Sequence, residues 1–102
     1  MNDNSLLLDK NQSDFFIPGK MPEFQFWLLI EISPIHSEKI ILALNDFLVK
    51  GYSRKEACGR YNISPGYFSG ALGRFQRVSL TVAQLVSYYD KPKTQTLSYV
   101  QR

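Results

Sequence analysis

Five basic side chains in one short segment have the clearest chemistry in this 102-residue chain. They are Arg54, Lys55, Arg60, Arg74 and Arg77, and Glu56 is the single acidic residue between the first and the last of them. Guanidinium and ammonium groups are the usual protein ligands of phosphate oxygens. We therefore expect these five side chains to bind phosphates, such as those of a nucleic-acid backbone.

The residue types that catalyse reactions or bind metals are nearly absent. The chain has one cysteine, Cys58, and one histidine, His36, so it can form neither an internal disulfide nor a Cys/His metal cluster. No histidine accompanies Cys58 as a base, and no phosphate-binding glycine loop precedes Lys-Ser/Thr. We expect no enzyme activity, no cofactor, no metal and no small-molecule substrate. Cys58 is more simply a small packing residue than a reactive thiol.

The charge is unevenly divided between the two halves of the chain. Residues 1–52 contain four Lys/Arg against seven Asp/Glu, whereas residues 53–102 contain eight against two. A basic half joined to an acidic half indicates that one part meets an anionic partner. Charge alone does not distinguish nucleic acid, a membrane surface and an acidic protein.

Apolar residues make up 44% of the chain and aromatic residues 14%, which predicts one small folded domain. The longest mostly apolar stretch, Phe24 to Ile32, contains Gln25 and Glu31 and is far shorter than the ~20 residues that span a bilayer. The first twenty residues lack the basic-then-apolar order of a secretory signal. We expect a cytoplasmic protein without membrane contact.

Helical spacing predominates, and no alternating strand pattern of useful length is present. The sequence predicts an all-α fold of four to five helices that contains a helix-turn-helix. We expect a flexible N-terminal arm over residues 1–20, a helical DNA-binding domain over 21–90 and a basic C-terminal tail over 91–102.

The first two helices are expected over residues 22–32 and from Pro34 or Ser37 to a stop at Gly51. Apolar residues surround more than one face of the first helix, so it must be buried on several sides or be covered by a partner. Apolar spacing also resumes over residues 80–89, either as an extension of the last helix or as a fifth helix.

A helix-turn-helix is predicted at about residues 53–77. Ser53 and Glu56 form a capping box that begins a short helix at Arg54. This helix is expected to end near Tyr61. Asn62 tolerates the positive φ that the turn needs, and Cys58 supplies the small residue where the two helices cross. The second helix then restarts at Ser64-Pro65.

The second helix of this pair has few groups that read bases. Ser64, Tyr67 and Ser69 are expected on its groove-facing side, and three glycines weaken it by ~1 kcal/mol each. These glycines would permit close approach to a DNA backbone or to another helix. We expect one protomer to discriminate sequences poorly and to rely on phosphate contacts, groove shape and repeated sites.

Several runs together resemble the PapB/FocB family of bacterial fimbrial (adhesin biosynthesis) transcription regulators. The resemblance rests on Phe26–Ile30, Ser33–Ala43, Gly51–Cys58, Gly66–Ser69 and Leu72–Arg74. It implies a nucleoid-associated helix-turn-helix protein that binds AT-rich double-stranded DNA at fimbrial operons as a homo-oligomer, with contacts in the minor groove. Arg54 and Cys58 match DNA-binding residues of that family.

Two other readings stay open from the residues themselves. In the first, the chain is a protein–protein interaction module whose basic half binds an acidic partner and whose apolar first helix self-associates. In the second, it binds RNA, although it lacks strands that would present an aromatic platform to bases. A gel shift with duplex DNA separates the first reading from a DNA-binding function.

Overall fold

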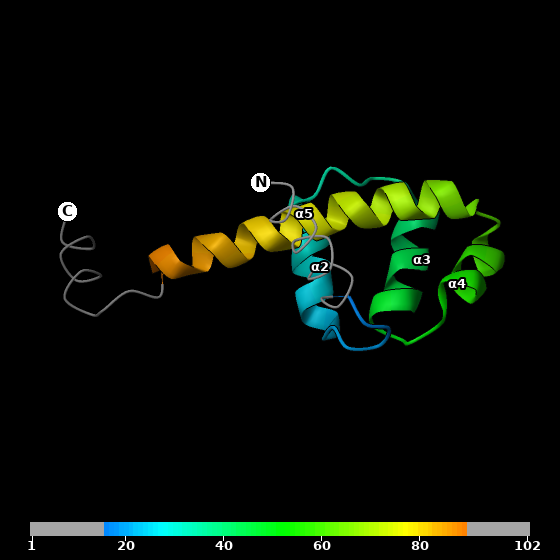
Figure 1. The fold of residues 1–102 in the computed structure, drawn as a ribbon, viewed down its shortest axis with the longest axis horizontal. Coiled ribbons are helices and arrows are strands. Elements are labelled where there is room, and N and C mark those ends of the chain that lie inside the picture. The colour runs from blue at the N-terminus through cyan, green and yellow to red at the C-terminus, as the bar shows by residue number, and fades with distance from the viewer. Residues whose placement is uncertain (1–15, 90–102) are drawn as a thin grey trace, which may run out of the picture.

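In a computed structural model, which describes residues 16–89, this part of the chain consists of helices and connecting loops without strands. The helices are α2 (Glu23–Ile32), α3 (Glu38–Leu48), α4 (Arg54–Tyr61) and α5 (Pro65–Tyr89). The long helix α5 runs along one side of the molecule, and α2, α3 and α4 follow one another beneath it (Figure 1). The predicted all-α fold is confirmed.

Local side-chain caps define the ends of the short helices. The Ser53 hydroxyl accepts a hydrogen bond from the Glu56 N–H (3.0 Å), and the Glu56 carboxylate accepts one from the Ser53 N–H (2.9 Å), which completes the predicted capping box. Asn62 ends α4 in the left-handed conformation, with φ 55° and ψ 53°. At the start of α3, the Ser37 hydroxyl accepts from the Ile40 N–H.

Two predicted boundaries need small corrections. Pro22 precedes α2 as its N-cap instead of lying in its first turn. Helix α3 ends at Leu48 and not at Gly51, because the chain already turns after Leu48. Gly51 has φ +89° and lies in the loop to α4.

The question that the sequence left open at residues 80–89 is answered by a single continuous helix. Helix α5 begins at Pro65, where the Ser64 hydroxyl accepts a hydrogen bond from the Tyr67 N–H (3.2 Å), and continues to Tyr89. Its length is on the order of 37 Å at 1.5 Å per residue. No helix among residues 16–89 is both long enough and apolar enough to cross a membrane.

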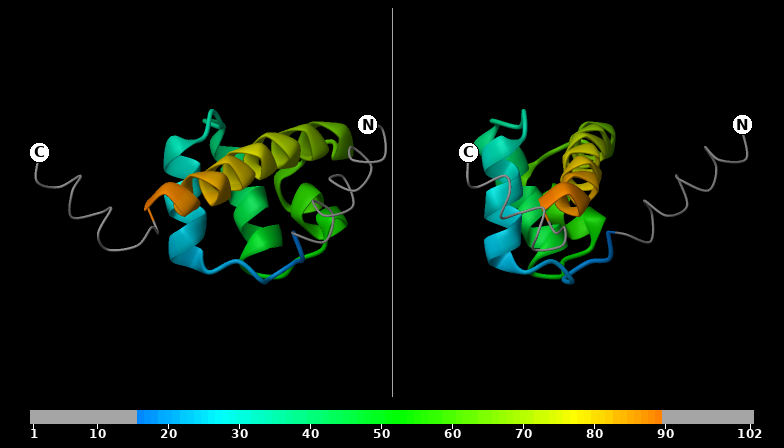
Figure 2. Two further views of the ribbon diagram at one scale, coloured as in Figure 1. Left: turned by 60° about the vertical axis from the view of Figure 1, so that its left-hand side comes forward. Right: turned by 90° about the vertical axis from the view of Figure 1, so that its left-hand side faces the viewer.

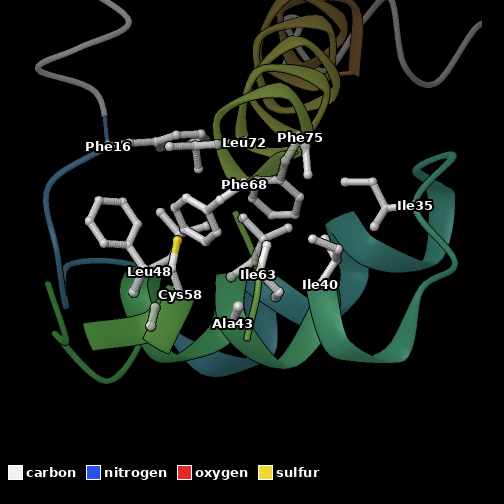
Figure 3. Packing of buried hydrophobic residues seen from close by; sticks show 14 of the residues in the cluster. Phe16, Ile35, Ile40, Ala43, Leu48, Cys58, Ile63, Phe68, Leu72 and Phe75 are labelled. Atoms are coloured by element: carbon white, nitrogen blue, oxygen red, sulfur yellow. The ribbon is translucent and has the colours of Figure 1, made fainter. Parts of the chain in front are cut away.

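One aromatic core joins α5 to the three shorter helices (Figure 3). The rings of Phe26 and Phe75 lie 5.4 Å apart, and those of Phe47 and Phe68 lie 5.9 Å apart, edge to face. Cys58, predicted at the crossing of α4 and α5, is buried there. The crossing is filled by buried small or apolar residues, with Tyr61 at its margin: Ala57, Cys58, Ile63, Phe68 and Ala71. The orientation of α5 against α4 is therefore fixed by packing.

The segment just before α2 is packed against the domain. The buried Phe16 ring lies 5.8 Å from that of Phe75, and the Gly19 N–H donates to the Phe47 carbonyl (3.0 Å). Gly19 also lies so close to Gly51 that an added Cβ would be 3.0 Å from the Gly51 Cα. Residues 16–20, which the sequence analysis placed in a flexible arm, thus pack on α3 and α5. Residues 1–15 and 90–102 of the predicted arm and tail lie outside the described residues.

Candidate nucleic-acid interface

A three-residue turn connects α4 to α5 and sets the angle between them. The Ile63 N–H donates to the Cys58 carbonyl (2.9 Å), and the Ile63 side chain is buried beneath the turn. Asn62, in the left-handed conformation, directs the chain away from the α4 axis. These contacts hold the N-terminal ends of α4 and α5 beside one hollow.

That hollow has a volume of about 520 Å³ and brings together four of the predicted site residues, Arg54, Lys55, Cys58 and Ser69. Its other lining residues are Gly59, Asn62, Ile63, Pro65 and Phe68. Cys58, Ile63 and Phe68 are buried, whereas Arg54 and Lys55 are exposed. The hollow therefore combines an apolar floor with two exposed cations, an arrangement suited to an anionic partner with an apolar part.

The charge of Arg54 acts on Cys58 at this site. The Arg54 guanidinium lies 5.7 Å from the centre of the Phe47 ring, a cation–π distance. Burial raises the pKa of the Cys58 thiol above its ordinary value, and the charge of Arg54 offsets part of this effect. The thiol is therefore neutral at physiological pH, and it packs at the crossing of the helices (Figure 3). Within residues 16–89, no three His, Cys, Asp or Glu side chains lie together to hold a metal ion.

Arg60 lies in a different environment from the other predicted contacts. Its Nε is 2.8 Å from Oδ2 of Asp46, an almost fully buried carboxylate on α3, and its guanidinium stacks over the Tyr52 ring at 4.7 Å. Lys50 lies 3.7 Å from the other Asp46 oxygen. A hydrogen bond with Tyr61 raises the pKa of Arg60, and Asp46 adds to the effect. Arg60 thus holds α4 against α3, a role that the sequence analysis missed, and its phosphate contact stays a prediction.

The exposed face of α5 is lined by glycines. Gly66, Gly70, Gly73 and Arg77 follow one another at spacings of four, three and four residues, which is one helical stripe. A Cβ added at Gly66 or Gly73 would meet nothing within 4 Å, and one added at Gly70 would meet Nη1 of Arg74 at 4.0 Å. No internal contact of the described chain therefore requires these glycines, although each costs the helix ~1 kcal/mol relative to alanine. At these glycines an outside partner can approach the α5 backbone closely.

The remaining predicted residues flank this stripe. Tyr67 and Arg74 lie on one side of it by helical position and Ser69 on the other, and all three are exposed. Ser64, also exposed, uses its hydroxyl oxygen to cap α5. The structure thus groups the hollow and the bare stripe on the same pair of helices, while Arg74 and Arg77 lie farther along α5.

Comparison with known proteins gives consistent matches. Residues 1–89 match the family model described as "adhesin biosynthesis transcription regulatory protein". The AFA-III adhesin operon regulatory protein of Escherichia coli is 60% identical over 89 residues, which is 87% of this chain and 88% of that protein. The F1845 adhesin operon regulatory protein of E. coli is 70% identical over 71 residues, 70% of this chain and 84% of that protein. The crystal structure of E. coli FocB is similar with a TM-score of 0.74 and 46% identity, covering 84% of this chain and 98% of that one.

Proposed function

This chain belongs to the family of adhesin biosynthesis transcription regulatory proteins, and we propose that it regulates fimbrial or adhesin operons by binding AT-rich double-stranded DNA as a homo-oligomer. It is a transcription regulator and not an enzyme. As a regulator of transcription it acts in the cytoplasm, associated with the nucleoid. Helices α4 and α5 act as the helix-turn-helix, with α5 facing a groove and the α4 N-terminus beside a phosphate strand.

One observation supports this proposal above the others: two exposed cations, Arg54 and Lys55, adjoin the helix that carries the glycine stripe. Phosphate contacts position a protein on the duplex, and the missing side chains at Gly66, Gly70 and Gly73 allow α5 to approach the DNA closely. The glycines alone would also admit a helix of a protein partner, so it is their position beside Arg54 and Lys55 that favours DNA.

The preference for AT-rich DNA follows from shape more than from base contacts. Serine and glycine dominate the exposed start of α5, and the groups that bind base edges in pairs are scarce there. AT-rich minor grooves are narrow and attract arginine side chains, and Arg74 and Arg77 project from the exposed part of α5. Because one protomer makes few specific contacts, several copies on clustered sites provide the affinity cooperatively.

A gel shift with a labelled AT-rich duplex, challenged by AT-rich and GC-rich competitors, tests this function. Arg54→Ala should weaken binding about tenfold through loss of one charge-assisted phosphate contact. Lys39→Ala removes the same charge from an exposed position on α3 and should leave binding nearly unchanged. Thermal unfolding of both variants controls for stability. Absence of any shift at moderate salt, or equal losses in the two variants, would refute the proposed interface and favour the protein–protein module.

A further inference from the structure

The hollow between α4 and the start of α5 has a part that phosphate binding does not use. Its volume of about 520 Å³ falls within the roughly 300–1,000 Å³ that is usual for small-molecule sites. Its apolar floor is formed by Cys58, Ile63 and Phe68, which pack at the crossing of the two helices (Figure 3). A DNA phosphate would contact the exposed cations and would give no reason for an apolar floor beside them. The floor therefore suits the apolar part of another ligand.

The charge around the hollow favours an anion. Arg54 and Lys55 are consecutive exposed residues in the first turn of α4. The two ion pairs within residues 16–89 both involve Asp46 of α3, and neither Arg54 nor Lys55 takes part in them. None of the described residues that line the hollow is acidic, and Glu56, the acidic residue of the same turn, caps the start of α4. An anionic group would therefore meet two positive charges that no described carboxylate neutralises.

We propose that the hollow binds a small molecule with one anionic head and an apolar body. The head lies at Arg54 and Lys55, and the body covers the apolar floor. The side chains of Asn62 and Ser69 also line the hollow and make no hydrogen bond within residues 16–89, so they are available to further polar groups of the ligand. Because affinity comes from a charge-assisted contact at one end and from apolar burial at the other, an anion without an apolar body should bind more weakly, and so should an apolar body without an anion.

A ligand bound in this way would compete with DNA, because Arg54 and Lys55 are also the proposed phosphate contacts. This competition rests on the proposed function, whereas the binding site itself does not. For two ligands that exclude each other, a small molecule at ten times its dissociation constant lowers the apparent affinity for DNA about tenfold. The hollow would thus act as an effector site that releases the regulator from its operator.

The anionic amphiphile 4-phenylbutyrate is the probe for this site. Acetate keeps its carboxylate without the apolar body, and 4-phenylbutylamine keeps the body with a cation in place of the anion. We expect 4-phenylbutyrate to bind the DNA-free full chain with a dissociation constant on the order of 1 mM or tighter. The two matched probes should bind at least tenfold more weakly.

An NMR titration of the ¹⁵N-labelled chain shows where the probe binds. Saturable shifts should occur at the backbone amides of Cys58, Gly59 and Ser69, which line the hollow. The indole N–H of Trp27 reports adsorption to exposed apolar residues elsewhere, since Trp27 is 40% exposed on α2. Helix α2 lies on the far side of α3 from α4 (Figure 1 and Figure 2), so this signal should stay in place.

Two variants with matched controls test the head and the body of the ligand separately. Arg54→Ala should raise the dissociation constant of 4-phenylbutyrate about tenfold, and Lys39→Ala, an exposed cation of α3, should leave it unchanged. A Cβ added at Gly59 would meet nothing within 4 Å, so Gly59→Leu fits the fold, takes up part of the hollow and should weaken binding at least tenfold. Gly73→Leu makes the same change outside the hollow and should bind as the wild type does. Circular dichroism should show unchanged helicity in all four variants.

The outcomes separate this proposal from the proposed function. Equal binding of the three probes, shifts centred on Trp27, or wild-type affinity in Gly59→Leu would overturn the site. In a gel shift at constant ionic strength, 4-phenylbutyrate should displace an AT-rich duplex and acetate should not, and retention of DNA by the probe-saturated chain would overturn the effector role. A chain that shifts the duplex without binding the probe contradicts this proposal alone. A chain that binds the probe and shifts no duplex contradicts the DNA-binding function alone.

Discussion

Replacing a glycine of the α5 stripe by alanine should make the protein more stable and its DNA binding weaker. Alanine is the better helix former by ~1 kcal/mol in a helix interior. A Cβ at Gly73 has open space within 4 Å, and one at Gly70 makes an ordinary contact with Arg74 at 4.0 Å. Each substitution should therefore raise the free energy of unfolding by about 1 kcal/mol and Tm by roughly 4–8 °C.

The same methyl group should obstruct the DNA. If α5 lies against the duplex with its bare backbone, each added Cβ displaces the helix from its contacts, and we expect a loss of affinity of about tenfold or more. Thermal unfolding by circular dichroism and titration of a labelled AT-rich duplex by fluorescence anisotropy measure the two quantities. Gln84→Ala, on the exposed end of α5, serves as the control and should leave DNA binding unchanged.

The two glycine-to-alanine variants should gain stability and lose DNA affinity. A folding defect lowers stability and binding together, so a more stable variant that binds less well can only have lost a contact with the partner. If Gly70→Ala and Gly73→Ala are both more stable and bind DNA with wild-type affinity, α5 does not approach the duplex through this face, and the proposed interface is wrong.

Two further predictions concern Arg60 and Cys58. Arg60→Ala should lower the free energy of unfolding more than Arg74→Ala does, since the almost fully buried Asp46 loses a partner at 2.8 Å. Equal effects of the two substitutions in urea denaturation would contradict the assignment of Arg60 to the fold. The Cys58 thiol should react slowly with iodoacetamide at neutral pH in the folded protein and fast in urea, because it is buried and its pKa is raised above 9.0. Since the unfolded thiol ionises first, its contribution to stability is constant below pH 9.0 and is lost as the pH rises through the folded pKa. Cys58→Ala should remove that part of the alkaline decline, and an identical decline in both proteins would refute the raised pKa.

The helix boundaries were predictable because their signals are local. Ser53 and Glu56 lie three residues apart and satisfy each other's backbone groups, and Asn62 supplies the turn conformation by itself. Burial at the crossing of α4 and α5 was also predictable, because a helix pair with a short turn constrains which positions meet. The family resemblance seen in the sequence is confirmed by the comparisons.

Contacts between distant elements were not predictable in the same way. The Asp46–Arg60 pair joins α3 to α4, and Arg60 resembles its basic neighbours in sequence although its Nε is bound to a buried carboxylate. Phe16 follows a polar segment, and only the three-dimensional structure shows its ring against Phe75. Helix α2 is apolar on several faces, so the sequence did not indicate which face enters the core and which stays exposed.

The salt dependence of DNA binding tests the central claim most directly. For one protomer on a one-site AT-rich duplex, neutralisation of ~3–4 phosphates predicts a slope of about −3 for the logarithm of affinity against the logarithm of salt concentration. Arg54→Ala should reduce the magnitude of that slope by about 1, whereas Lys39→Ala should leave it unchanged. A slope near zero, or the same slope in the wild type and Arg54→Ala, would contradict the account in which Arg54 and its basic neighbours bind the DNA backbone.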